Sequence, residues 1–377
     1  MRRLFRLRFV LVALAIVAST AGVFINAVPT KAQKPVRIIN VVNGTLGDKS
    51  FFDSAERGLV RAKQELGIEY KTIELTDDAS RWESGLNDAM ADTANYDILI
   101  AGTFSMADYM TARADMYPDK KFIMYDTGVD YTKCKCTNVY SIVYAQNEGS
   151  YLAGVYVASM IKDGKLPNLA GKHTIGAVGG EDVQVINDFI VGYEQGAKAI
   201  DPSIVMLKQY IGGNSPYFDP AKAKEIALAM YEQGADFVFG IAGNSGLGVI
   251  DAAKEKGKYA IGVDSDQATI INATDPKAAA QILTSMKKNV DNSLFFALSQ
   301  DKAGKLEYGK QVTLGLAQDA VGLAVNDIYN KATPDDIKKL IDQTKADIIS
   351  GKIKVDSAFE PAPAATMEAT MEATAAG

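Results

Sequence analysis

The sequence predicts an α/β fold built from two doubly wound, parallel-sheet lobes. Between residues 34 and 359, short apolar segments alternate with longer segments of helical periodicity. This is the pattern of strands that helices cover on both faces. Two such series occur, at 34–144 and at 145–264, and each has the length of an ordinary domain. They are expected to be the N-terminal and the C-terminal lobe.

The segment 265–359 is too short and irregular for a third domain. We expect part of 265–310 to complete the N-terminal lobe and part of 311–359 to complete the C-terminal lobe. The chain would then cross between the lobes more than once. Several crossings make a hinge that bends while each lobe stays rigid, an arrangement suited to closing around a ligand.

The predicted strands are short and rich in apolar or β-branched residues. They are 36–42, 70–74, 97–101, 121–126, 174–178, 205–210, 237–241 and 259–263. The predicted helices have apolar residues at helical spacing. They are 52–65, 81–94, 150–161, 185–200, 220–233 and 246–256. Ligands of open parallel sheets bind beyond the carboxyl ends of strands, so the residues just after each strand are the candidates for a site.

Residues 1–32 have the pattern of an export signal. Four arginines within the first eight residues precede an apolar run at 9–28, and Ala27 and Ala32 are candidate processing points. The run is long enough to span a bilayer, so an uncleaved anchor is the alternative. We expect an exported protein, in the periplasm or at the outer face of the cytoplasmic membrane. The Ala/Thr/Pro-rich stretch 360–377 is predicted to be a disordered tail.

The charge of the chain argues against a nucleic-acid partner. The full sequence has 40 basic and 46 acidic residues, a net charge of −6. Residues 1–32 hold five basic residues and no acid, so the remainder has 35 basic residues and a net charge of −11. A strongly acidic protein repels phosphate backbones, and no nucleic acid is expected to bind.

Catalytic and metal chemistry has few candidate residues. His173 is the only histidine, and no catalytic signature surrounds it, which weakens a Ser/His/Asp or Cys/His system. Zinc needs a cluster of ligands that is absent from the sequence. Cys134 and Cys136 form a C-x-C motif, and a disulfide across one residue is strained, so two thiols or a local irregularity are expected. We expect no cofactor and no metal.

Aromatic and acidic residues follow the strands of the N-terminal lobe. Phe51 and Phe52 stand together at a helix start and cannot both face the core, so one of them could stack on a flat ligand. The alternative is that both pack within the lobe. Phe104 occupies a similar place after the third strand. Asp126 ends the fourth strand, where it would cap a turn or accept ligand N–H groups.

Polar turns also follow the strands of the C-terminal lobe. Asp182 stands in a Gly-Gly-Glu-Asp turn, and Gly243 begins a glycine-rich turn whose spacing is not that of a dinucleotide site. That turn still offers backbone N–H groups at a helix N-terminus. Asp264 and Asp266 end another strand, where a carboxylate could accept two sugar hydroxyls or could cap a helix.

Several segments resemble, in a fixed order, the basic membrane protein family, the PnrA-like substrate-binding proteins of ABC transporters. They are 44–54, 117–122, 151–155, 179–180, 242–243, 261–267 and 283–285. The most specific are the Asp-Lys-Ser-Phe turn at 48–51 and the Gly-Val-Asp-Ser-Asp-Gln motif at 262–267. The resemblance runs over nearly the whole body of the chain. It implies the type I periplasmic-binding fold and, from characterised members, purine nucleoside binding.

The resemblance also implies roles for single residues. Phe51 resembles the phenylalanine that stacks on the base. Asn43 and Asp126 resemble the polar residues that read the base. The chain departs from the family at Val42 and at Phe52, where members commonly have an acid and an asparagine. A glycine is common where Asn244 stands, and these departures leave the base open.

A second set of residues resembles the ribose contacts of the family. These are Gly243, Asp264 and Lys288. We expect Lys288 to lie three residues after Ser285 on one helix face. Lys287 is the alternative, because the two lysines are adjacent.

The sequence therefore predicts a monomeric, exported binding protein of an ABC importer. It would capture a nucleoside, with a purine expected, between two lobes and deliver it to a membrane permease. No bond is made or broken, so an enzyme is not expected. The alternatives are the same binding role for a sugar or another heterocycle, a membrane-anchored nucleoside sensor, and a nucleoside hydrolase. The last would need a general base or metal-ligand acids at the ribose.

Overall fold

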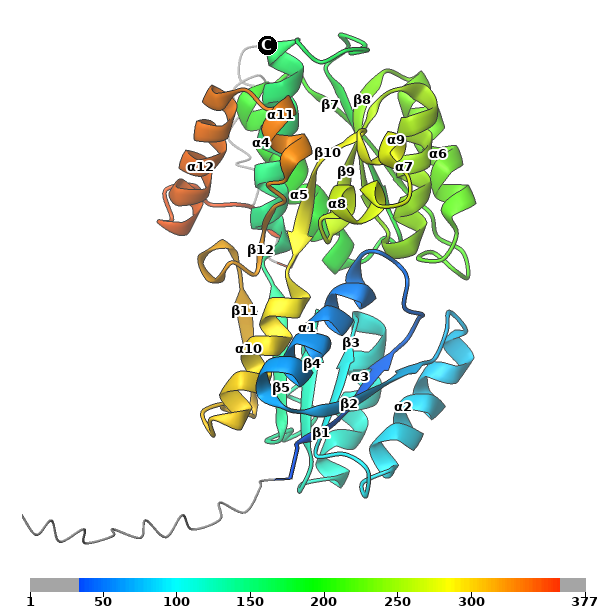
Figure 1. The fold of residues 1–377 in the computed structure, drawn as a ribbon, viewed down its shortest axis with the longest axis vertical. Coiled ribbons are helices and arrows are strands. Elements are labelled where there is room, and N and C mark those ends of the chain that lie inside the picture. Colours follow the sequence, from blue (N-terminus) through cyan, green and yellow to red (C-terminus); the bar gives the residue numbers. More distant parts are fainter. Residues whose placement is uncertain (1–33, 360–377) are drawn as a thin grey trace, which may run out of the picture. The chain divides into compact units, whose positions relative to one another are not determined.

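A computed structural model describes residues 34–359 (Figure 1). In it, five strands from the first half of the chain and one strand from near residue 310 form a six-stranded parallel sheet. The predicted export signal at 1–32 and the predicted disordered tail at 360–377 lie outside the described residues. The strand order is β11-β5-β4-β3-β1-β2, and all five pairings are parallel. The strands are β1 (Arg37–Val42), β2 (Glu69–Glu74), β3 (Ile98–Gly102), β4 (Lys121–Tyr125), β5 (Val139–Tyr144) and β11 (Lys310–Leu314).

A second six-stranded sheet has the order β12-β10-β9-β8-β6-β7. Its strands are β6 (Thr174–Gly179), β7 (Val205–Tyr210), β8 (Ala235–Ile241), β9 (Tyr259–Asp264), β10 (Ile282–Lys288) and β12 (Val321–Leu323). Only the β10–β12 pair is antiparallel. The predicted fold class, α/β with two doubly wound parallel sheets, is confirmed.

Helices lie against both faces of the sheets (Figure 1). They are α1 (Phe51–Leu66), α2 (Trp82–Ala91), α3 (Phe104–Arg113), α4 (Gln146–Asp163), α5 (Gln184–Ile200), α6 (Pro220–Glu232), α7 (Gly246–Lys256), α8 (Gln267–Asn272), α9 (Pro276–Ala279), α10 (Val290–Lys302), α11 (Asp327–Ala332) and α12 (Asp335–Ile349). Short 3₁₀ turns are η1 (Ala79–Arg81), η2 (Ala114–Met116), η3 (Gly243–Ser245) and η4 (Leu316–Gln318).

Strand β3 shows how the alternation of side chains builds two cores. Ile98 and Ile100 are buried on one face together with Leu59 of α1. Leu99 is buried on the other face with Met90 of α2. Both faces are apolar, so the strand reads as a continuous hydrophobic run, which is why it was recognisable in the sequence.

The chain passes between the two sheets three times. It leaves the first sheet after β5, returns to it after β10 for β11, and leaves again for β12. Strands β5, β10, β11 and β12 were not predicted from the sequence, and neither were the helices from α8 to α12. Of α3, only a helix start near Phe104 was expected. Several of these strands are short or end in charged residues, and such strands lack the continuous apolar pattern.

Cys134 and Cys136 form a disulfide in the loop between β4 and β5, so the expectation of two thiols is wrong. Their Cα atoms are 5.3 Å apart, which lies within the usual range for disulfides. Cys136 has a φ of +43°, and this left-handed conformation turns the chain back so that the two side chains meet.

Helices α4 and α5 pack unusually closely because glycines lie at their contact. A Cβ atom at Gly154, Gly192 or Gly196 would lie 2.1 Å from a backbone carbonyl oxygen of the other helix. Gly196→Val is therefore expected to destabilise the protein by roughly 3 kcal/mol, because backbone atoms cannot move aside as a side chain can. Thermal unfolding measures the loss. Ala199→Val, at an exposed position of the same helix, is the control, and an equal loss there would contradict the packing argument.

Candidate functional site

A cavity of about 730 Å³ lies at the carboxyl ends of strands from both sheets. Its lining comes from residues at or after the ends of β1, β2, β3 and β4 of the first sheet and of β6, β7, β8, β9 and β10 of the second. Parallel strands leave their carboxyl ends at one edge of a sheet, so the fold itself brings these turns together. The volume falls in the range of small-molecule sites, about 300–1,000 Å³.

Seven of the eight residues proposed from the sequence line this cavity. They are Asn43, Phe51, Phe104, Asp126, Gly243, Asp264 and Lys288. Residues far apart in the sequence thus converge at one place, as the rule for open parallel sheets requires.

Asp182 is the exception, because it is not among the residues that line the cavity. Its side chain is exposed, and its Oδ1 accepts a hydrogen bond of 2.8 Å from Nδ2 of Asn187. The preceding residue, Glu181, lines the cavity instead. Burial raises the pKa of the Glu181 carboxyl. The sequence showed the turn but not which of its two acids faces inward.

Lys288 ends strand β10, so its predicted position on a helix face is wrong. Successive strand residues point to opposite faces, and this resolves the choice between the two lysines. Lys288 is only 2% exposed, whereas Lys287 is half-buried. Ser285 accepts a hydrogen bond from the backbone N–H of Gln267 and does not share a face with Lys288.

The ammonium group of Lys288 lies in a buried, partly aromatic environment. Its Nζ donates a hydrogen bond of 2.5 Å to Oδ1 of Asp126. It also lies 4.6 Å from the ring centroid of Phe189, 5.5 Å from that of Tyr144 and 5.7 Å from that of Phe51. The ion pair and the ring faces offset the loss of hydration that burial imposes on the charge.

Asp264 is the last residue of strand β9, at the edge of the second sheet where Lys288 also lies. Its φ is +62°, a conformation that aspartate tolerates better than most residues. Its side chain is buried, and its Oδ2 accepts a 2.6 Å hydrogen bond from Oγ of Ser50. Burial raises the pKa of Asp264 to about 6, while Lys288 and Ser50 oppose the rise. Repulsion from Asp48 and Asp126 adds to it.

The raised pKa of Asp264 predicts pH-dependent affinity for a ligand that this carboxylate contacts. If the ionised carboxylate accepts ligand hydroxyls, affinity should fall below pH 6, by about tenfold for each further pH unit. Unfolding does not explain such a fall. An acid whose pKa rises from 3.8 to about 6 on folding stabilises the fold as the pH decreases through that window. Calorimetric titrations from pH 7.5 to 5 measure the effect. Asp264→Asn should remove most of the pH dependence and leave the part due to Glu181, whose pKa is also raised by burial. An unchanged slope in that variant would contradict the assignment.

Phe51 is positioned by a carboxylate at the start of α1. Asp48 is buried and accepts hydrogen bonds from the backbone N–H groups of Ser50, Phe52 and Asp53, at 2.9, 2.9 and 3.1 Å. The ring of the half-buried Phe51 lies 5.3 Å from that of Tyr125. Asp48 thus satisfies the helix N-terminus and fixes the turn that presents Phe51 to the cavity.

Hydrogen bonds join this turn to the second sheet. Oγ of Ser265 donates to the carbonyl of Ser50 at 2.8 Å, and the guanidinium of Arg57 donates to Oγ of Ser265 at 2.8 Å. Gln267 Nε2 donates to the carbonyl of Lys49 at 3.3 Å. The two sheets are therefore bridged directly beside the cavity.

Several lining residues were missed by the sequence analysis. Trp82, Tyr217 and Phe218 add aromatic surface, and Ser215 Oγ donates to Asp77 Oδ2 at 3.1 Å across the two sheets' loops. Trp82 is the only tryptophan of the chain, which was an available signal. Ser215, Tyr217 and Phe218 lie several residues beyond the end of β7, and Asp77 lies three residues beyond the end of β2, so none of them stands directly after its strand.

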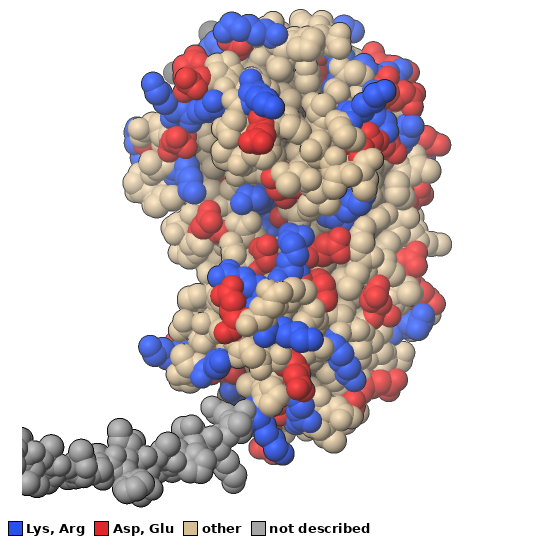
Figure 2. Space-filling model, in the orientation of Figure 1, with Lys and Arg blue, Asp and Glu red and all other residues tan. Residues whose placement is uncertain are grey.

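The charge of the lining is strongly negative. Six carboxylates face one lysine, the acids being Asp48, Asp77, Asp78, Asp126, Glu181 and Asp264. The outer surface differs, because both signs of charge are interspersed on the face shown in Figure 2. Within residues 34–359, no group of three or more His, Cys, Asp or Glu side chains is arranged to hold a metal ion. The same residues include no helix with the length and apolar run needed to cross a bilayer.

Comparisons with known proteins agree with one another. A family model described as "ABC transporter substrate-binding protein PnrA-like" matches residues 36–357. The "ABC transporter nucleoside-binding protein BmpA" of Lactococcus lactis subsp. cremoris is 33% identical over 340 residues, covering 87% of this chain and 90% of that protein. "Basic membrane protein D" of Borreliella burgdorferi is 32% identical over 305 residues, covering 78% and 82%.

Solved structures share the fold. An ABC transporter solute-binding protein from Aeropyrum pernix superposes with a TM-score of 0.75 at 24% identity, over 88% of this chain and 95% of that chain. Another from Conexibacter woesei has a TM-score of 0.66 at 21% identity, over 86% and 100%.

Proposed function

This chain belongs to the PnrA-like family of ABC transporter substrate-binding proteins, and we propose that its cargo is a nucleoside, with a purine as the base. Proteins of this family bind a substrate for a membrane ABC permease and are not enzymes. The nucleoside-binding relative at 33% identity supports the choice of cargo.

One observation carries the proposal: an aromatic ring and buried hydrogen-bonding charges share one cavity. Phe51 offers a ring face on which a base can stack, which contributes about 1–3 kcal/mol in other base–aromatic contacts. Asp264 and Lys288 are buried and charged, and they suit the hydroxyl groups of a ribose. Hydrogen bonds to ionised groups are among the strongest that proteins make.

The remaining residues take roles around these two ends of the ligand. Asn43 and Asp126 read the polar edge of the base, and Phe104 forms part of the wall beside it. The side-chain oxygen Oδ1 of Asn43 accepts a hydrogen bond of 3.0 Å from Oγ1 of Thr103, which leaves the side-chain N–H₂ group of Asn43 for a ligand. Gly243 contributes backbone atoms next to the ribose.

We propose that residues 34–144 and 145–264 are the cores of two lobes that close around the nucleoside. The hydrogen bonds from Ser265 and Gln267 to the turn before α1 support this, because they join the two sheets beside the cavity. Closure would exclude water and strengthen the charged contacts. The protein would be exported through residues 1–32 and act as a monomer outside the cytoplasmic membrane, where it would meet its permease.

Isothermal titration with adenosine, guanosine, inosine, uridine, free bases and simple sugars tests the function. Purine nucleosides are expected to bind more tightly than uridine and than either half of the ligand alone. Tight binding of a sugar or another heterocycle, with no binding of any nucleoside, would reject the proposal.

The acidic lining is expected to exclude phosphorylated ligands. A nucleoside 5′-monophosphate should bind roughly tenfold or more weakly than the nucleoside, because its charge meets six carboxylates and one lysine. The 5′-O-methyl nucleoside is the control, since it adds bulk without charge. Calorimetric titration compares the two ligands. If the methyl ether binds as weakly as the monophosphate, steric crowding around the 5′ position causes the weaker binding, and the electrostatic argument fails.

A further inference from the structure

The Cys134–Cys136 disulfide lies outside the cavity and has no place in ligand binding, and we propose that it is a thiol–disulfide exchange site for an external dithiol. It closes a loop of three residues, with a sequence separation of 2, and both cysteines belong to the same β4–β5 connection. Disulfides stabilise folds by linking distant parts of the chain, and the effect decreases as the loop shortens. This bond therefore adds little as a brace.

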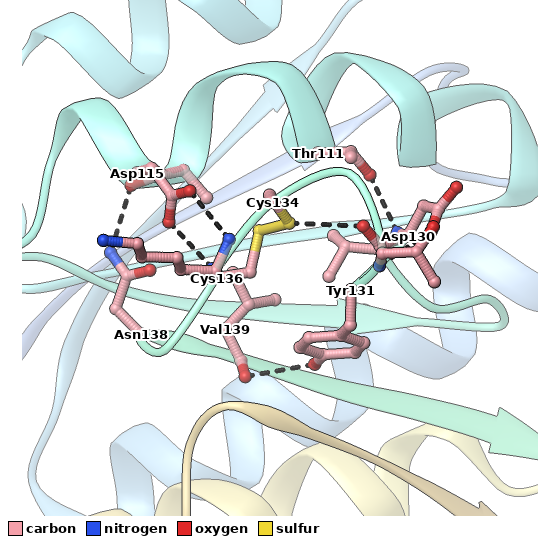
Figure 3. Close-up of a disulfide and its surroundings, with 12 residues drawn as sticks. Thr111, Asp115, Asp130, Tyr131, Cys134, Cys136, Asn138 and Val139 are labelled. Carbon is pink, nitrogen blue, oxygen red and sulfur yellow. Dashed lines mark hydrogen bonds between the residues drawn. A yellow bond between two sulfur atoms is a disulfide. The ribbon is translucent and has the colours of Figure 1, made fainter.

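Other contacts hold the loop in place without the disulfide (Figure 3). The carboxylate of Asp115 accepts hydrogen bonds from the backbone N–H groups of Lys135 and Cys136, at 2.9 and 2.8 Å. Nδ2 of Asn138 lies within hydrogen-bond distance of three carbonyl oxygens, those of Ala114, Tyr117 and Lys120. These contacts fix the backbone at 135–138, and the N–H of Cys134 donates to the carbonyl of Asp130 at 3.3 Å. The loop should therefore persist when the sulfur–sulfur bond is cleaved.

The two sulfur atoms differ in access, which sets the direction of attack. Cys134 is half-buried, whereas Cys136 is fully buried in the core of the first sheet. Lys133 and Lys135, which flank Cys134, are exposed. Positive charge near a sulfur favours its thiolate form, so these lysines assist the second step of the exchange, in which Cys134 is the leaving group. Nζ of Lys133 also forms an ion pair with Oδ2 of Asp130, at 3.2 Å.

The reduced form has contacts ready for it. Sγ of Cys134 lies 3.5 Å from the carbonyl oxygen of Asp130, which can accept the hydrogen of a Cys134 thiol (Figure 3). Cys136 has its φ of +43° in a region that residues with a Cβ atom occupy at a cost. Cleavage removes one of the constraints that keep it there.

The exchange proceeds in two balanced steps. A thiolate of the dithiol attacks Sγ of Cys134, the sulfur–sulfur bond breaks, and its electron pair leaves on Sγ of Cys136, which takes a proton. The second thiolate of the dithiol then attacks the first sulfur of the dithiol, which is bonded to Sγ of Cys134 in the mixed disulfide. This releases Cys134, which takes a proton in turn. The protein gains two electrons and two protons, and the dithiol becomes a disulfide.

Reduction is not expected to reach the cavity. The loop between Asp126 and the disulfide is anchored midway, by a 3.2 Å hydrogen bond from the N–H of Val129 to Ser141 Oγ and a 3.0 Å bond from the N–H of Asp130 to Thr111 Oγ1. Both anchors lie between the cavity residue and the cysteines. Nucleoside affinity should therefore change by less than about twofold on reduction.

Titration of the folded, full-length protein with dithiothreitol tests the proposal. After acid quenching and alkylation, intact mass reports reduction without ambiguity, because the chain has only these 2 cysteines. We expect complete reduction without denaturant, and a melting temperature that falls by less than about 4 °C. Reduction that requires denaturant, or a larger fall in melting temperature, would make the disulfide a structural brace and overturn the proposal.

Single-cysteine variants test which sulfur is attacked. Cys136→Ser leaves Cys134, and it should react with the aromatic disulfide dithionitrobenzoate at least tenfold faster than Cys134→Ser, which leaves the buried Cys136. Circular dichroism of both variants confirms that they are folded. Equal rates in two folded variants would contradict the assigned direction. If either variant fails to fold, the titration of the natural disulfide still decides.

Discussion

Replacement of Lys288 by methionine is expected to destabilise the protein by about 3–5 kcal/mol and to abolish tight nucleoside binding. Methionine keeps the apolar stem of lysine but removes the charge. The Asp126 side chain, 9% exposed, would then be a buried carboxylate without its ion-pair partner. Removal of one member of a buried pair is costly because the other charge stays dehydrated. Thermal unfolding and isothermal titration measure the two effects.

The double variant Lys288→Met/Asp126→Asn separates stability from binding. It replaces the ion pair with neutral side chains of similar shape, so most of the lost stability should return. Affinity should stay at least tenfold below that of the natural protein, since the ammonium that we propose as a donor to the ligand is still absent. A double variant that is no more stable than Lys288→Met would show that the unpaired carboxylate is not the cause. Natural affinity in either variant would remove Lys288 from the site.

The position of Lys288 could not be predicted from the sequence. Strands such as Ile98–Gly102 were predictable because helices cover both faces and every residue is apolar. Strand β10 ends in Met-Lys-Lys, which resembles the charged side of a helix. Its buried lysine is stabilised by Asp126, which is 162 residues away in the sequence, and by aromatic rings that are also distant in the sequence. No local pattern contains that information.

The candidate site divides in the same way. Residues directly after strands, such as Asp126 and Asp264, could be predicted because the topology brings strand ends together. The choice between Glu181 and Asp182 depends on the path of a single turn. Tyr217 lies in an irregular loop whose position is set by contacts with other loops and not by its own sequence. Strand topology therefore predicts the place of a site better than its complete lining.

Phe51→Ala is expected to weaken nucleoside binding by about 5- to 150-fold. The range corresponds to the loss of one base–aromatic stack, about 1–3 kcal/mol. Phe296→Ala is the control, because Phe296 lies on α10, is 54% exposed and does not line the cavity. Isothermal titration with the tightest purine nucleoside measures both variants, and equal losses would contradict a specific role for Phe51.

Two further substitutions distinguish a stacked ring from apolar filling. Phe51→Tyr keeps the ring face and should bind within about threefold of the natural protein. Phe51→Leu keeps apolar volume without a π-face and should lose most of the stacking energy. The Phe51 ring also contacts Phe52, at a centroid distance of 5.4 Å, so the melting temperature of each variant must be measured alongside its affinity. If the leucine and tyrosine variants bind alike while both remain folded, Phe51 only fills space and the base must be held by another group, for which Tyr217 would be the first candidate.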